Sequence, residues 1–145
     1  MKLFTIFCIT LFISYNSYGQ KTSSIKFEFD EYQKDWALIQ KNGKFGFINR
    51  DGYEIVRPRY DSIGKFGDFD SNLAFIVKNG KLGFINRDGY EIVKPMYNKI
   101  EKFGIYNPDW ALVERNGKFG FINKDGYEIV KPRYNTYEQY KVANP

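Results

Sequence analysis

The sequence contains no histidine and a single cysteine, Cys8, among its 145 residues. Cys8 lies in a segment that we expect to be removed, so metal binding through imidazole or thiolate ligands is excluded. A nucleophile activated by histidine is excluded because the sequence contains no histidine. Proline is also scarce, with five residues, whereas aromatic residues make up 19% of the chain. This composition favours a packed, strand-rich core over disorder.

A large excess of charge of one sign is also lacking. The chain has 22 basic and 17 acidic side chains, a formal net charge of +5. An excess this small does not by itself indicate a nucleic-acid or membrane partner. The acids at 68 and 70 are not repeated in the equivalent loop at 105–107, which argues against a calcium site, and no glycine-rich phosphate loop opens a helix. We therefore predict no cofactor and no bound metal.

Residues 1–19 have the pattern of an export signal. Lys2 is followed by an apolar run over 3–13, and Ser17 and Gly19 stand three residues and one residue before a cleavage point at Gln20. The run is too short to span a bilayer comfortably. We expect a cleaved signal peptide and a mature chain 20–145, without a transmembrane span, in the periplasm or outside the cell. Export argues against a nucleic-acid partner.

The main signal in the sequence is a repeat of 37 residues, marked by an Asn-Gly pair that recurs at 42, 79 and 116. The nineteen residues that start at each pair differ at only four positions between the three copies. Recent duplication explains this identity most simply, and a repeated ligand contact is the alternative. The predicted units cover residues 24–60, 61–97 and 98–134, with a partial capping unit at 135–145.

Each unit is predicted to form three short antiparallel strands, which in the first unit are 36–40, 44–49 and 53–57. Asn-Gly is a strong signal for a two-residue hairpin, and Asp51-Gly52 is expected to form a second turn of the same kind. Pairing should stop at Pro58 or continue only along a sheet edge. Gly46 lies in mid-strand, which indicates a bulge or a close backbone approach.

These features predict an all-β fold of three tandem antiparallel meanders, each of about 37 residues, stacked in a short open array. A propeller-like arrangement is the alternative, although propellers typically have four or more blades. The terminal segments 20–30 and 135–145 are expected to cap the array, by adding strands. Tyr140, which falls in register with Phe29, Phe66 and Phe103, would begin a partial fourth unit.

Three motifs of the unit together resemble the WG-repeat (KWG) family: Gly-Lys-Phe-Gly-Phe-Ile at 43–48, Asp-Gly at 51–52 and Pro-Arg-Tyr-Asp at 58–61. The resemblance covers roughly residues 25–140. It implies a β-repeat architecture and a binding or scaffolding role, with no catalytic residues to carry over. The family's tryptophan is replaced by Phe45, Leu82 and Phe119, so a ligand contact made by that tryptophan would not carry over.

The candidate ligand-binding residues are aromatic and basic side chains that recur with the repeat. Aromatic rings can stack on sugars or anchor protein contacts, and core filling is the alternative. Recurring lysines and arginines could form a cationic stripe or an ordinary solubilising surface. The candidates are Tyr53, Tyr90, Tyr127, Lys44, Lys81, Lys118, Trp36 and Trp110.

Two functions are consistent with these residues. The first is a non-catalytic, exported module that binds or scaffolds a protein in the bacterial envelope, and the alternative is a module that binds cell-wall or surface polysaccharide. A protein partner predicts an apolar patch that differs between units. A polysaccharide predicts the same tyrosines and lysines exposed in all three. Enzymatic activity is not expected, because acids such as Asp51 and Glu54 lie among basic residues that can pair with them.

Overall fold

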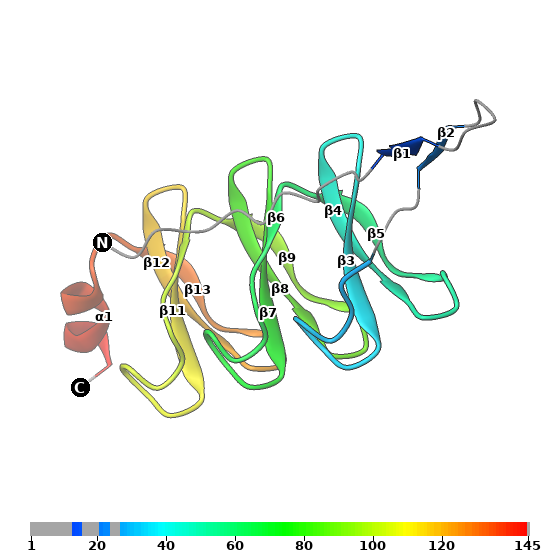
Figure 1. Ribbon diagram of the computed structural model, residues 1–145. Helices are drawn as coiled ribbons and strands as arrows, with labels where there is room; N and C mark the ends of the chain where they lie inside the picture. The colour runs from blue at the N-terminus through cyan, green and yellow to red at the C-terminus, as the bar shows by residue number, and fades with distance from the viewer. Residues whose placement is uncertain (1–12, 16–20, 24–26, 145) are drawn as a thin grey trace, which may run out of the picture.

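The structure is a computed structural model that describes residues 13–15, 21–23 and 27–144. Within these residues it shows three antiparallel sheets packed one after another along the chain, with a short helix at the C-terminal end (Figure 1). This confirms the predicted all-β array. The sheets do not close into a ring in the described part of the chain, so the propeller alternative is wrong. Most of the predicted signal peptide, residues 1–19, lies outside the described residues.

Each sheet contains the predicted three-stranded meander. A small ribbon of β1 (Ile13–Tyr15) and β2 (Lys21–Ser23) precedes the array. The second and third sheets each begin with a two-residue strand that the sequence analysis missed. The first sheet consists of β3 (Trp36–Lys41), β4 (Lys44–Asn49) and β5 (Glu54–Tyr60). The second consists of β6 (Ser62–Ile63), β7 (Leu73–Lys78), β8 (Lys81–Asn86) and β9 (Glu91–Tyr97). The third consists of β10 (Lys99–Ile100), β11 (Trp110–Arg115), β12 (Lys118–Asn123) and β13 (Glu128–Tyr134).

The two turns of each repeat differ in kind. Asn42 and Gly43 have φ values of 52° and 74°, as a two-residue hairpin with both residues left-handed requires. At the second turn only Gly52 has a positive φ, of 85°. There the N–H of Gly52 donates to the carbonyl of Asn49 at 3.0 Å. The expectation that Asp51-Gly52 repeats the Asn-Gly chemistry is therefore wrong, because an Asn49-centred turn replaces it.

The mid-strand glycine is explained by a bulge. Between the pairs Phe47–Val56 and Phe45–Tyr60 the register of β4 and β5 shifts. A Cβ on Gly46 would lie 2.3 Å from the carbonyl oxygen of Val56, and the other two repeats have the same geometry. β5 continues past Pro58 to Tyr60, but it is an edge strand and Pro58 sits within the bulge, where its missing N–H breaks no ladder.

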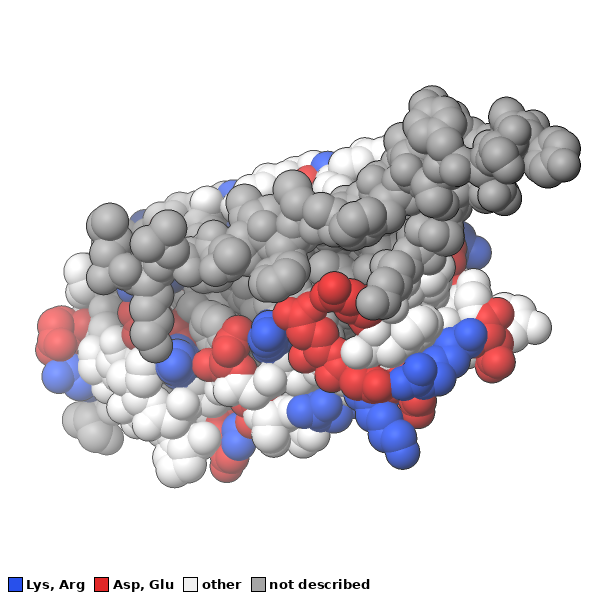
Figure 2. All heavy atoms as spheres, in the orientation of Figure 1, with Lys and Arg blue, Asp and Glu red and all other residues white. Residues whose placement is uncertain are grey.

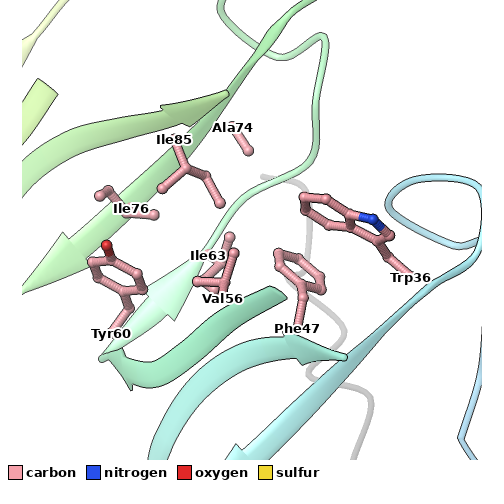
Figure 3. Packing of buried hydrophobic residues seen from close by; sticks show 8 residues of the cluster. All are labelled: Trp36, Phe47, Val56, Tyr60, Ile63, Ala74, Ile76 and Ile85. Atoms are coloured by element: carbon pink, nitrogen blue, oxygen red, sulfur yellow. The ribbon is translucent and has the colours of Figure 1, made fainter. Parts of the chain in front are cut away.

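The hydrophobic core lies between sheets, because each repeat covers apolar side chains of its neighbour. The first cluster joins residues of the first sheet to residues of the second, and Figure 3 shows their side chains meeting between the strands. Its members are Trp36, Phe47, Val56, Tyr60, Ile63, Ala74, Ile76 and Ile85. A second cluster, at equivalent positions, joins the second and third sheets. Neither sheet could bury these residues alone, as expected of a repeat array.

The C-terminal segment caps the array with a helix, α1 (Tyr137–Ala143), and the expectation of an added strand is wrong. The hydroxyl of Thr136 accepts a hydrogen bond from the N–H of Gln139 at 3.2 Å and so begins the helix. Tyr140 lies on this helix with its ring 5.0 Å from that of Phe121. Tyr140 thus covers Phe121 of the third sheet, as Phe103 of the third repeat covers Phe84 of the second sheet.

Candidate functional site

The predicted site residues lie on two opposite edges of the array. The Asn-Gly hairpins precede the second strand of each repeat, and the Asn49-type turns follow it. Lys44 begins β4 and Asn49 ends it, so the two edges are separated by roughly 17 Å. The three lysines and the three tyrosines therefore do not form one site. We call the edge that carries Tyr53, Tyr90 and Tyr127 the tyrosine edge.

The three tyrosines are exposed to the same degree. Their exposed fractions are 70%, 69% and 69% for Tyr53, Tyr90 and Tyr127. In the first repeat the N–H of Tyr53 donates to the side-chain oxygen of Asn49 at 2.9 Å, and its carbonyl accepts from the N–H of Asn49 at 3.0 Å. The other two turns have the same bonds. The backbone of each tyrosine is thus fixed before any ligand arrives, which lowers the entropic cost of binding.

The opposite edge, which carries Lys44, Lys81 and Lys118 and which we call the lysine edge, holds neighbouring repeats together. Lys44 forms an ion pair with Asp61, whose carboxylate also accepts the N–H of Asn79 in the next repeat at 2.6 Å. The hydrogen bond from Lys44, and then that from Asn79, lower the pKa of Asp61 below its usual value. Lys118 donates in the same way to Asn135, and Lys81 lies half-buried at the matching position. We therefore leave the lysines out of the candidate site.

The tryptophans belong to the core. Trp36 is 8% exposed and its ring contacts those of Phe47 and Phe66, at centroid distances of 5.3 and 6.1 Å. Trp110 is half-buried against Phe121 at 5.7 Å. Both begin strands at the tyrosine edge but turn inward, so we leave them out of the candidate site as well.

Charges on the surface are mixed in sign. Figure 2 shows basic and acidic side chains next to one another on the visible face of the array. Arg50, for example, pairs with Asp30 at 2.5 Å and with Asp35 at 2.6 Å. Pairs such as these neutralise charge locally, as on an ordinary solubilising surface.

A groove of about 620 Å³ opens on the tyrosine edge between the second and third repeats. Its walls come from the loop before β7 and from the turn before β13, and Tyr127 stands at its mouth. The lining residues are Asp70, Ser71, Asn72, Leu73, Asn86, Ile92, Lys124, Asp125 and Tyr127. Apart from Tyr127, none of these residues is predicted from the sequence to belong to a site. The available signal was that positions 70 and 124 differ from their counterparts in otherwise near-identical copies.

The groove is polar and carries more acid than base. Lys124 lies 3.4 Å from Asp70 and 3.6 Å from Asp109. The Asp70 side chain is only 14% exposed, and it also accepts the N–H of Asn72 at 2.9 Å. With Asp125 as a further carboxylate, the lining has two acids and one base. Such a groove is suited to hydrogen bonding with a neutral polar ligand.

Two tyrosines outside the groove are bound across the repeat junctions. Tyr60 donates to Glu91 at 2.7 Å and Tyr97 donates to Glu128 at 2.8 Å. Burial, and then the hydrogen bond to the carboxylate, raise the pKa of Tyr60 to about 12. The same causes raise the pKa of Tyr97. These hydroxyls stay protonated near neutral pH and serve packing.

The described residues contain neither a metal-binding cluster nor a membrane-spanning helix. In the described ranges, no three side chains of histidine, cysteine, aspartate or glutamate are grouped so that they could hold a metal ion. The helix that the structure describes is too short and too polar to cross a membrane.

A family model described as the WG containing repeat matches the chain three times in tandem, over residues 45–81, 83–119 and 119–141. No curated protein and no solved structure matches the chain. The three matches together cover most of the sequence. Each of the first two runs from the second strand of one meander to the start of the second strand of the next. The chain therefore belongs to the WG-repeat family.

Proposed function

We propose that this protein is an exported, non-catalytic module that binds an extended polysaccharide of the cell envelope along its tyrosine edge. The observation that carries the proposal is the near-identical exposure of Tyr53, Tyr90 and Tyr127 on three rigid, equivalent turns. An exposed aromatic ring gives the apolar face of a sugar a surface on which to stack.

The repeat of the array suits a polymer. Sheets packed face to face lie about 10 Å apart, so equivalent turns recur at short, regular steps. A linear polysaccharide also presents the same group at short, regular steps, so sugars spaced at regular intervals along it can meet successive tyrosines. Weak contacts at three linked positions then add up to a useful affinity. This supports a glycan polymer over a globular partner for this edge.

A non-catalytic role is supported by the chemistry of the side chains. The chain has no histidine, and its one cysteine is Cys8. In the groove, Asp70 is held by Lys124 and by a backbone N–H, as expected of a positioned hydrogen-bonding group. Export is supported by the pattern of residues 1–19, which places the module where envelope polysaccharides occur.

A protein partner is the second candidate, because the third repeat and α1 carry exposed apolar side chains. Ile105, Ile129 and Val142 are 58%, 44% and 82% exposed. The residue that corresponds to Ile105 in the second repeat is Asp68, so this patch is not repeated along the array. A partner that uses it would bind at the C-terminal end, away from the row of tyrosines.

The test is co-sedimentation of the purified protein with insoluble envelope polysaccharide from the source cell. Changing Tyr53, Tyr90 and Tyr127 together to alanine should reduce the bound fraction at least tenfold, since all stacking contacts are lost. The matched control changes Arg57, Lys94 and Lys131 to alanine, because these three exposed side chains also occupy equivalent positions.

Unchanged binding by the tyrosine variant would contradict the proposal, and loss in the charge variant alone would indicate an anionic ligand held by charge. A discrete envelope protein that the wild type retains, and that a variant with Ile105→Asp and Ile129→Asp does not, would support the second candidate instead.

A further inference from the structure

We propose that the groove between the second and third repeats is a subsite for a neutral sugar unit, kept open by Asp70 and Lys124. The inference rests on the proposed polysaccharide binding and adds to it where the ligand is anchored and which class of sugar it is. It comes from a difference between two junctions that are otherwise built from near-identical sequences.

The first junction is bridged by a side-chain pair. Gln33 donates to the carbonyl of Arg87 at 2.7 Å, and the guanidinium of Arg87 donates to the side-chain oxygen of Gln33 at 3.2 Å. Arg87 also donates twice to the carbonyl of Ser71, at 2.9 and 2.7 Å, and lies 4.7 Å above the ring of Phe66. The planar guanidinium is therefore fixed across this junction.

The second junction has Asp70 and Lys124 at the same two positions, 37 residues further on. Aspartate is shorter than glutamine by one methylene group, and the ammonium of lysine lacks the fork of donors that ties Arg87 to three partners. The pair makes a single contact at 3.4 Å. The groove of about 620 Å³ lies at this junction, within the range of about 300–1,000 Å³ typical of small-molecule sites.

The lining indicates the class of ligand. Carboxylate, carboxamide and hydroxyl groups of Asp125, Asn72 and Ser71 line the groove, and Tyr127 adds a ring at its mouth. Such groups bind the adjacent hydroxyls of a sugar, while the ring stacks on its apolar face. The single cation, Lys124, is already paired with Asp70. An anionic sugar would meet a net negative lining, so a neutral sugar is favoured over a uronate.

The test is a reciprocal exchange of the two junctions. Asp70→Gln with Lys124→Arg gives the second junction the bridging pair of the first, and Gln33→Asp with Arg87→Lys does the reverse. Calorimetric titration uses short probes that cannot reach all three tyrosines: disaccharides of glucose, of mannose and of N-acetylglucosamine, with digalacturonate as the anionic probe.

We expect the wild type to bind at least one neutral disaccharide and to bind digalacturonate at least tenfold more weakly. Closing the second junction should weaken neutral binding about tenfold or more, whereas the reverse exchange at the first junction should not weaken it. Tyr127→Ala should weaken it and the matched Tyr53→Ala should not. Unchanged thermal unfolding temperatures of the exchange variants and of both tyrosine variants separate these effects from misfolding.

The inference is overturned if no neutral disaccharide binds, if digalacturonate binds more tightly, or if well-folded exchange variants bind like the wild type. Should the wild type still co-sediment with polysaccharide through its tyrosines in any of these cases, the proposed function stands and only the subsite is lost. Should it bind neither polymer nor disaccharide, both fail.

Discussion

Strands β9 and β13 have nearly the same sequence and very different surroundings. They differ at one position of seven, yet Val93 and Tyr97 in β9 are 3% and 2% exposed, whereas Val130 and Tyr134 in β13 are only half-buried. The reason is that another repeat covers β9, while a short helix follows β13. The comparison teaches that in this array the next repeat, and not the local sequence, decides which residues form the core.

The ionisation of the matching tyrosines follows the same division. Burial and the hydrogen bond to Glu128 raise the pKa of Tyr97. At the open end, hydrogen bonds from Asn144 and Arg133 lower the pKa of Tyr134. The pKa values of two tyrosines at the same repeat position are thus shifted in opposite directions, because only Tyr97 is followed by another repeat.

The largest expected loss of unfolding free energy comes from adding a methyl group to a turn glycine that lies against the preceding repeat. Gly126 has φ +84°, and a Cβ there would lie 2.3 Å from the carbonyl oxygen of Ile92 in the preceding repeat. Gly126→Ala should lower the unfolding free energy by about 3 kcal/mol, from positive-φ strain and displacement of the junction. Urea unfolding followed by circular dichroism measures the loss.

Gly52 is the matched control, because it has φ +85° and nothing within 4 Å of the added Cβ. Gly52→Ala should cost only the backbone strain, about 1 kcal/mol. Equal losses in Gly126→Ala and Gly52→Ala would show that contact between repeats contributes little to stability, and would contradict the difference between covered and open positions.

A smaller effect is expected from removing the hydroxyl of a junction tyrosine. Tyr97→Phe deletes the 2.8 Å bond to Glu128 and should cost about 1 kcal/mol, while Tyr134→Phe should cost close to nothing. The measurement is the difference between the urea midpoints of the two variants. If Tyr134→Phe lowers the urea midpoint more than Tyr97→Phe does, then α1 covers the third sheet as effectively as another repeat would.

The smallest effect near neutral pH is the one tied to ionisation of Tyr60. Its folded-state pKa, about 12, lies above the ordinary value of about 10, so the stability that its protonated form contributes is complete below pH 10 and is lost as pH rises towards 12. The unfolding free energy should therefore fall between about pH 10 and about pH 12, and fall less in Tyr60→Phe. Identical slopes in the two proteins would show that Tyr60 is not the group responsible.

The local features of the repeat could be predicted because they depend on neighbouring residues. The Asn-Gly pairs require positive φ at two successive positions, and this fixed both the hairpins and the strands that flank them. Gly46 indicated a bulge because glycine in mid-strand otherwise has no advantage. Spacing along the chain was sufficient for these predictions.

Other features could not be predicted because they depend on contacts between distant residues. The strands β6 and β10 have two residues each, too few for a pattern to show, and exist because the first meander strand offers them an edge. Its recurrence with the repeat makes Trp36 a candidate ligand contact, but its ring packs against Phe66 of the next repeat, which sequence spacing does not show. The lysines and tyrosines were grouped as one site because a list of recurring residues does not show which edge each occupies.

The sequence by itself determined the repeat, its strands, its turns and its membership of the WG-repeat family, because these follow from local backbone preference and a period of 37 residues. Only the tertiary structure decided which aromatic rings face solvent, which lysines are held in junctions and where a groove opens. Those outcomes depend on how one repeat stacks on the next, and Asp70 and Lys124, 54 residues apart in the chain, become neighbours only through that stacking.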